Sequence, residues 1–281
     1  MGASPGVSPG RVALLALPGA LVLALFFVAP LLAVVGEAAV DGGAACGRVL
    51  ADPLFRTGLV NSLGLGAAAG LVSLLVGGAV ALHLSELPAG RRTALMFLIS
   101  LPLTFSGLIV AYGFILAFGR AGFVTLLLAP LGVDPATFAG FIYGPVGLAF
   151  AYCYYLVPRV VLMLLPTLVN FDRAQLRAAE SMGAGRARAL IDVLLPQVLP
   201  TALAAFCLVA AVAIGAYGTA LALVGTQVNI LPLQLYSKIA DAGADFPAAA
   251  ALSLILLGVC SLVLGIGETW VARRDQRAAG A

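Results

Sequence analysis

The side chains that could do metal or acid–base chemistry in this 281-residue chain are few and lie far apart. His83 is the single histidine, and it has no second candidate ligand four residues away. The four cysteines are widely spaced, and three lie inside apolar runs, where a small hydrophobic side chain is the expected role. We therefore expect no metal site, no disulfide framework and no catalytic residue. The four are Cys46, Cys153, Cys207 and Cys260.

A guanidinium and several phenol hydroxyls stand out within the apolar runs instead. Arg159 is the one charge well inside a run, and it follows Tyr152 and Tyr155 in the same run. One hypothesis is that Arg159 faces a path through the protein and favours an anionic or zwitterionic solute. The alternative is that its side chain snorkels toward the cytoplasmic end of the run. Tyr217 and Asn61 are weaker candidates for the same path, since polar groups in spans often only bridge helices.

The composition sets the environment in which these side chains must act. Hydrophobic residues make up 62% of the chain and charged residues only 10%, whereas charged residues form about 25% of a soluble domain. The apolar runs have the length that a helix needs to cross about 30 Å of hydrocarbon. The net charge of +3 is small, and the basic residues are spread among loops, so we expect no nucleic-acid partner. We predict an all-α membrane protein with one domain over residues 1–281.

Six apolar runs predict six transmembrane helices, with both termini on the same side of the membrane. The first run is too long for the hydrophobic part of a signal peptide. Two further apolar segments are too short to span: we expect 123–131 to be interfacial or re-entrant, and 229–243 to form an outer surface helix. The predicted spans are 12–36, 59–84, 93–118, 138 to about 169, 198–224, and 248 to about 270.

The distribution of basic residues predicts the orientation, because Lys and Arg are retained on the cytoplasmic face. Placing both termini in the cytoplasm leaves ten basic residues inside and four outside. The inner set is Arg11, Arg91, Arg92, Arg173, Arg177, Arg186, Arg188, Arg273, Arg274 and Arg277, and the outer set is Arg48, Arg56, Arg120 and Lys238. Lys238, Asp241 and Asp245 on the outer helix either meet a soluble partner or form a solvated face.

The loop between the fourth and fifth spans has clear signals for a helix and its end. Asp172 stands at an N-cap position with Gln175 three residues later, as in a capping box. A helix is expected over 173–182, and Gly183 can adopt the positive φ at which helices often end. A second helix is expected over 184–195. The loop is therefore predicted to form a helix-turn-helix on the cytoplasmic face.

One side of the first predicted loop helix carries apolar residues at helical spacing. Leu176, Ala179 and Met182 recur at i, i+3 and i+6, which places them in a narrow stripe. A stripe of this kind is typical of a helix that docks in the groove of a partner.

The loop resembles the signature of the permease family of binding-protein-dependent ABC importers. That signature runs Glu-Ala-Ala, three residues, Gly, nine residues, Ile or a similar residue, one residue, and Leu-Pro. Arg177 occupies the position of the leading glutamate, and Glu180 is close enough to supply part of its charge. The positions that match are Ala178, Ala179, Gly183, Val193, Leu195 and Pro196. The coupling loop that the resemblance implies comprises Arg177, Ala178, Ala179, Glu180, Met182, Gly183, Ala184, Val193, Leu195 and Pro196.

The resemblance covers about residues 61–269 and implies a type I fold of about six transmembrane helices with a cytoplasmic coupling helix between the fourth and fifth. The chain also resembles, more weakly, the polyamine and 2-aminoethylphosphonate subgroup of this family through the run Gly215, Ala216, Tyr217 and Gly218. The implied location is the bacterial inner membrane. The implied partners are ATPase subunits, a second permease that is distinct or identical, and a periplasmic or lipid-anchored binding protein.

ATP must then be bound by a partner subunit, and this chain needs no cofactor of its own. Its only lysine, Lys238, follows no glycine, so the chain has no P-loop. A secondary transporter is the main alternative, although none of the twelve acidic residues lies in the middle of a predicted span. A membrane enzyme is the second alternative and lacks a converging set of catalytic residues. Both alternatives predict activity without an ATPase. The sequence does not identify the solute.

Overall fold

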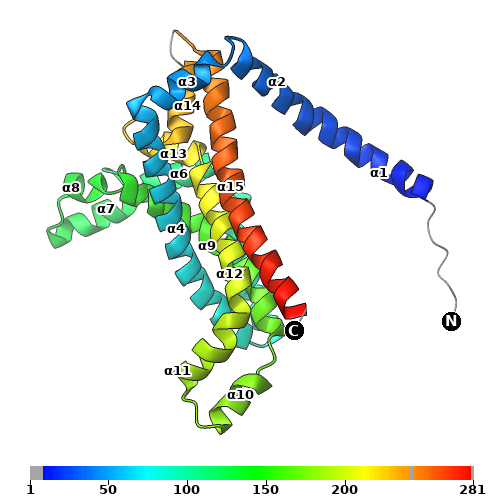
Figure 1. The fold of residues 1–281 in the computed structure, drawn as a ribbon. Coiled ribbons are helices and arrows are strands. Elements are labelled where there is room, and N and C mark those ends of the chain that lie inside the picture. Colours follow the sequence, from blue (N-terminus) through cyan, green and yellow to red (C-terminus); the bar gives the residue numbers. More distant parts are fainter. Residues whose placement is uncertain (1–8, 241–242, 280–281) are drawn as a thin grey trace.

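The computed structural model describes residues 9–240 and 243–279, and every regular element within them is a helix (Figure 1). Six helical segments are long and apolar enough to cross a membrane, which confirms the predicted number. Asp241 lies outside the described residues. The candidate spans are Leu15–Ala39, Pro53–Glu86, Gly107–Leu131, Pro145–Asn170, Arg186–Ile214 and Phe246–Val271.

Several of these spans consist of more than one regular element. The first half of the chain contains α1 (Pro9–Leu23), η1 (Ala24–Val28), α2 (Ala29–Ala39), α3 (Ala44–Ala51), α4 (Pro53–Glu86), α5 (Ala89–Ser100), η2 (Leu101–Thr104), α6 (Gly107–Phe118), α7 (Phe123–Leu128), η3 (Ala129–Leu131) and α8 (Pro135–Gly140). The second half contains α9 (Pro145–Asn170), α10 (Ala174–Ser181), α11 (Arg186–Ala189), η4 (Leu190–Leu194), α12 (Leu195–Ile214), α13 (Gly218–Val224), α14 (Leu231–Ala240) and α15 (Phe246–Ala279).

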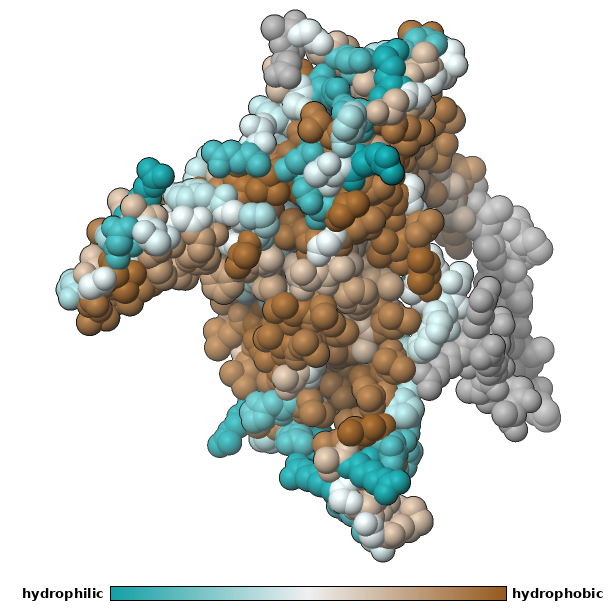
Figure 2. All heavy atoms as spheres, turned by 60° about the vertical axis from the view of Figure 1, so that its left-hand side comes forward, coloured by the Kyte–Doolittle hydropathy of each residue, from teal (hydrophilic) through white to brown (hydrophobic). Residues whose placement is uncertain are grey.

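The helices α4, α9 and α12 form the centre of the bundle, and α15 packs against α12 (Figure 1). The helix α10 lies at one end of the bundle, while α3 and α14 lie at the other. The helices α7 and α8 project from the side, and α1 extends away from the bundle. Hydrophilic residues gather at the two ends, and a broad hydrophobic belt separates them (Figure 2). This distribution is the one expected of a protein whose middle section is surrounded by lipid.

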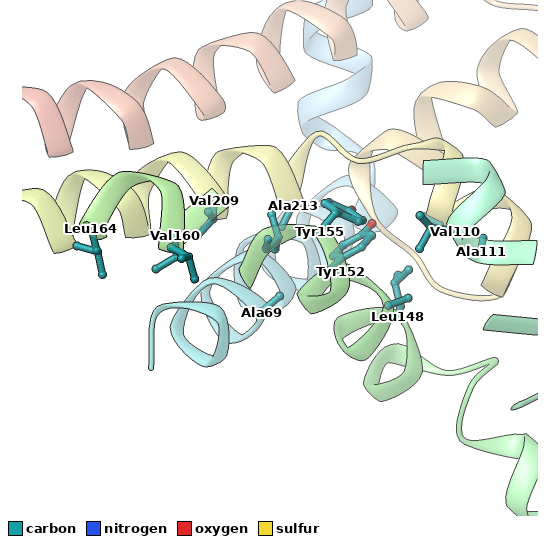
Figure 3. Close-up of a cluster of buried hydrophobic side chains, with 14 of the residues drawn as sticks. Ala69, Val110, Ala111, Leu148, Tyr152, Tyr155, Val160, Leu164, Val209 and Ala213 are labelled. Carbon is teal, nitrogen blue, oxygen red and sulfur yellow. The ribbon is translucent and has the colours of Figure 1, made fainter. Parts of the chain in front are cut away.

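Small residues let α4 approach its neighbours closely. Gly66, Gly70, Ser73 and Gly77 are all buried and recur along one face of α4. A Cβ atom on Gly77 would lie 2.8 Å from the Val160 Cβ atom. Close backbone approach through small residues is a common way for membrane helices to associate, since lipid provides little hydrophobic drive for helix–helix contact. The core that α9 forms with these helices includes fully buried Val160 and Val209 (Figure 3).

Gly77→Leu is therefore expected to destabilise the bundle by about 1–3 kcal/mol, the usual cost of overpacking. Both Val160 and the Val157 carbonyl oxygen would have to move, and the latter belongs to the backbone of α9. Thermal unfolding of the purified chain in detergent measures the effect. Gly64→Leu is the matched control, because Gly64 is exposed on the same helix and a Cβ atom there would meet no neighbour within 4 Å. Equal melting temperatures for the two variants would contradict this account of the α4–α9 contact.

The third and fifth spans differ from the predicted continuous helices over 93–118 and 198–224. The helix α5 ends at Ser100, and the chain then passes through η2. Ser106 caps the next helix, α6. The candidate span that begins with α6 continues to Leu131. Pro102 has no backbone N–H to continue the ladder of α5, which favours a break there. The fifth span begins earlier than predicted and stops at Ile214, and the chain then reaches α13 through three residues outside regular structure.

The fifth span runs without interruption from α11 through η4 into α12, so Pro196 does not end a helix. The N–H of Leu195 donates to the carbonyl of Leu190, an i to i+5 bond that marks a π turn. Pro196 cannot donate a backbone hydrogen bond, and its ring would clash with the carbonyl four residues earlier in a regular α-helix. The wider turn accommodates both constraints.

The predicted helix over 229–243 is α14, which lies at the end of the bundle opposite α10 (Figure 1). It is fastened to the start of α4 by polar side chains. The Asn61 side-chain amide donates to the Asn229 carbonyl at 2.9 Å, and the Leu231 N–H donates to the Ser62 hydroxyl at 2.9 Å. Asn61 and Ser62 therefore hold α14 against α4.

Candidate functional site

The helix α10 starts close to the predicted position and ends as the sequence predicts. The Asp172 carboxylate accepts a hydrogen bond from the Ala174 N–H at 2.9 Å, one residue before the N-cap position at Arg173. Gly183 has a φ of +90°. The Gly183 N–H donates to the Glu180 carbonyl at 3.0 Å and the Ala184 N–H to the Ala179 carbonyl at 3.1 Å. These two bonds form a Schellman motif, so α10 stops at a turn that favours glycine.

The side chain of Gln175 does not complete the predicted capping box. Its Oε1 atom accepts a hydrogen bond from the Gln197 side-chain amide at 2.7 Å. Gln197 belongs to α12, so this bond ties α10 to the fifth span. The capping box was predicted from local spacing alone, and a partner 22 residues away replaces it.

A second tie connects the start of the loop to the end of α4. The Arg173 guanidinium donates to the Ser85 hydroxyl at 3.0 Å and lies 3.4 Å from the Glu86 carboxylate. These two ties fasten the segment 172–185, here called the α10 hairpin, to two different spans. Sequence reasoning missed Gln197, Ser85 and Glu86 because all three lie far from the hairpin in the chain.

The predicted apolar stripe on α10 is not one exposed face. Ala179 is only 8% exposed, and Leu176 packs against the core of the chain itself, whereas Met182 is 82% exposed at the tip. The i, i+3, i+6 spacing identified a shared side of the helix, but the chain's own bundle covers most of that side. The exposed residues of the hairpin instead include Arg177, Ala178, Glu180, Met182 and Gly183.

The remaining predicted loop residues lie beyond these exposed residues. Ala184 is partly exposed in the turn that follows Gly183. Val193 lies in η4, and Leu195 and Pro196 begin α12. They belong to the continuous helix that joins the hairpin to the bundle.

A cavity of about 440 Å³ lies where both broken spans meet α9. One wall comes from the break between α5 and α6, and another comes from the break between α12 and α13. Arg159, Tyr155 and Tyr217 all line this cavity, so the structure brings together three of the five residues predicted for a path. Ser106 and Thr219 also line it and were not predicted.

The Arg159 side chain turns back along α9 rather than toward its carboxyl end. Its guanidinium carbon lies 5.4 Å from the centre of the Tyr155 ring, within the range of a cation–π contact. Tyr155 is one turn nearer the start of α9. The end of α9 at Asn170 is eleven residues from Arg159, a distance of about 16 Å at 1.5 Å per residue. In this structure the Arg159 guanidinium therefore lies against Tyr155 and does not extend toward that end.

Tyr152 and Asn61 do not line the cavity. Tyr152 is fully buried and donates its hydroxyl proton to the Ala216 carbonyl at 2.9 Å, which supports the break after α12. Its ring lies beside that of Tyr155, with 5.8 Å between the ring centres (Figure 3). Asn61 lies at the junction of α4 and α14. Within residues 9–240 and 243–279, no three His, Cys, Asp or Glu side chains are grouped as metal ligands.

The chain is similar to known components of transport systems. Residues 73–275 match the family described as "Binding-protein-dependent transport system inner membrane component". The chain is 28% identical over 222 residues to the spermidine/putrescine transport system permease protein PotB of Escherichia coli K12, covering 76% of this chain and 78% of PotB. It is 28% identical over 252 residues to the putative 2-aminoethylphosphonate transport system permease protein PhnU of Salmonella choleraesuis, covering 88% of this chain and 86% of PhnU.

Solved structures share the fold. A chain of a bacterial alginate ABC transporter, crystallised in complex with an alginate-bound periplasmic protein, aligns with a TM-score of 0.73 over 94% of both chains. The sequence identity in that alignment is 18%. A second crystal structure of a bacterial ABC transporter that imports alginate aligns with a TM-score of 0.70.

Proposed function

This chain belongs to the family of binding-protein-dependent transport system inner membrane components, and from that premise we propose that it forms the solute path of an ABC importer driven by a separate ATPase. Membership in this family makes the chain a permease rather than an enzyme. The proposal adds a mechanical role for the α10 hairpin, which seats in the ATPase and transmits its closure to the spans.

The observation that carries the proposal is the way in which the hairpin is fastened. Its tip is exposed at Met182, while Arg173 ties its start to α4 and Gln175 ties its body to α12. A displacement of the tip would therefore move two spans together instead of bending a loose loop. Alternating access in transporters requires such relative movement of helix groups about a fixed site.

The orientation and the remaining partners follow from charge and position. The end that carries α10 is rich in arginine, which supports a cytoplasmic location for it and for both termini. The opposite end, with α3 and α14, would receive solute from a binding protein outside the membrane. A second permease subunit would complete the path, and we favour a distinct chain over an identical copy.

Reconstitution into proteoliposomes tests the proposal. The chain is combined with the ATPase, the second permease and the binding protein encoded beside it, and uptake of the solute held by that binding protein is measured. We expect uptake only when all components and ATP are present. Uptake by the chain without ATPase or ATP would overturn the proposal in favour of a secondary transporter.

The broken spans are a feature that secondary transporters also use for binding coupling ions. Such sites hold a cation, which a nearby positive charge disfavours. No acidic side chain is among the residues that line the cavity, and its one charged lining residue is Arg159. This arrangement favours the importer over the ion-coupled alternative.

A further inference from the structure

We infer that the cavity between the two broken spans binds an oxyanion group of the transported solute, with Arg159 as the principal donor. The inference rests on the proposed function, because it assigns a solute class to the proposed path. The oxyanion is a carboxylate, phosphonate or phosphate, all of which offer the same acceptor oxygens to a guanidinium.

One buried donor that lacks a partner carries the inference. The Arg159 Nη1 atom is buried and has no hydrogen-bond partner in the part of the chain that the structure describes. The Tyr155 ring lies beside this guanidinium group. Tyr155 as a whole is only 8% exposed. Buried polar atoms in native proteins are nearly always satisfied, so an unpaired guanidinium nitrogen on a residue that lines a cavity indicates a ligand that completes it.

The positive charge in the cavity favours a ligand of negative charge. Arg159 is the only charged residue among those that line the cavity, and no carboxylate within the described residues forms an ion pair with it. Its contact with the Tyr155 ring offsets only part of its charge. A polycationic solute would add to this positive charge, whereas an oxyanion would neutralise it.

The start of α6 adds donors at the same place. Ser106 caps this helix, and Ser106, Gly107 and Leu108 all line the cavity. The first N–H groups of a helix have no partner within the helix, and they carry partial positive charge. α6 has 12 residues, enough for its dipole to be developed. Gly107 also lies against the buried Thr219 hydroxyl, which brings the two breaks into direct contact.

Thermal unfolding of the detergent-solubilised complex with its ATPase tests the inference without needing transport. The probes are methylphosphonate and acetate, compared with tetramethylammonium chloride at equal ionic strength. We expect both oxyanions to raise the melting temperature of the wild-type complex, since a ligand that binds only the folded state stabilises it. Arg159→Gln should lose this increase, and Arg159→Lys should retain a smaller one.

Lys238→Gln is the matched control, because it removes a cation on α14 that does not line the cavity. It should keep the full increase. Equal melting temperatures of the wild-type complex in all three salts would overturn the inference, as would an increase that persists in Arg159→Gln. Neither result would affect the proposed function, whose test is ATP-dependent uptake. If ATP-dependent uptake failed while the oxyanions still raised the melting temperature, only the proposed function would be overturned.

Discussion

Gly183→Val is expected to reduce ATP-driven uptake about tenfold or more in the reconstituted importer. Gly183 has a φ of +90°, a conformation that a β-branched residue rarely adopts. A left-handed conformation costs an L-residue roughly 1–2 kcal/mol, which corresponds to a factor of about 5–30 in population. The strain falls on the Schellman turn, so the hairpin would populate other conformations that do not fit the ATPase.

Gly185→Val provides the control for this prediction. Gly185 lies two residues further along with a φ of −65° and a ψ of +155°, which any residue can adopt, and a Cβ atom there would meet no neighbour within 4 Å. Its variant should transport as the wild type does. Co-purification of the ATPase is measured for both variants, so that lost assembly is separated from lost motion. If Gly183→Val transported at the wild-type rate, the conformation of the turn at Gly183 would not matter for ATP-driven uptake.

The double variant Arg173→Ala with Gln175→Ala is expected to uncouple the importer. It removes both ties from the hairpin, to Ser85 and Glu86 on one side and to Gln197 on the other. Each tie contributes only about 0.5–1.5 kcal/mol, so the fold and the exposed tip should survive. ATP hydrolysis should continue, while solute imported per ATP falls about threefold to tenfold because the hairpin moves without the spans.

Arg188→Ala is the control for uncoupling. Arg188 forms an exposed ion pair with Asp192 at 3.3 Å within the continuous helix from α11 to α12, and so it ties no span to another. Its variant should keep the wild-type ratio of uptake to hydrolysis. If the double variant also keeps that ratio, the two ties do not transmit the movement of the hairpin.

The sequence was sufficient to predict the features that depend on local composition. Six apolar runs correspond to six spans because a helix must be about 20 residues long to cross the bilayer. Gly183 was predicted to end α10 because positive φ favours glycine. The family resemblance, based on the spacing from Ala178 to Pro196, agrees with the family match over residues 73–275.

The features that depend on distant contacts could not be predicted. The break after Ile214 depends on Tyr152, which lies 64 residues away in the chain and donates to the Ala216 carbonyl. The break after Ser100 does have a local signal in Pro102, which the prediction of a continuous helix over 93–118 overlooked. The burial of Ala179 depends on how the hairpin folds back on its own bundle. The close approach of α4 to α9 at Gly77 was also missed, although the recurring small residues of α4 are a signal that could have indicated it.

The residues predicted to line the path were also only partly identified from the sequence. Arg159 was identified because a charge in an apolar run is costly and therefore needs a reason, and it does line the cavity. Asn61 was identified on the weaker ground that it is polar within a span. Its hydrogen bond to the Asn229 carbonyl gives it a structural role at the end of the bundle.

The most direct measurement of the central claim is whether the tip of the hairpin touches the ATPase. Met182 is replaced by the photoreactive residue p-benzoylphenylalanine, and the assembled complex is irradiated. Leu131, which is 77% exposed on the projecting segment that follows α7, receives the same residue in a control complex. We expect the probe at position 182 to cross-link to the ATPase and the probe at position 131 to form no such product. Cross-linking to the ATPase at 131 but not at 182 would contradict the account.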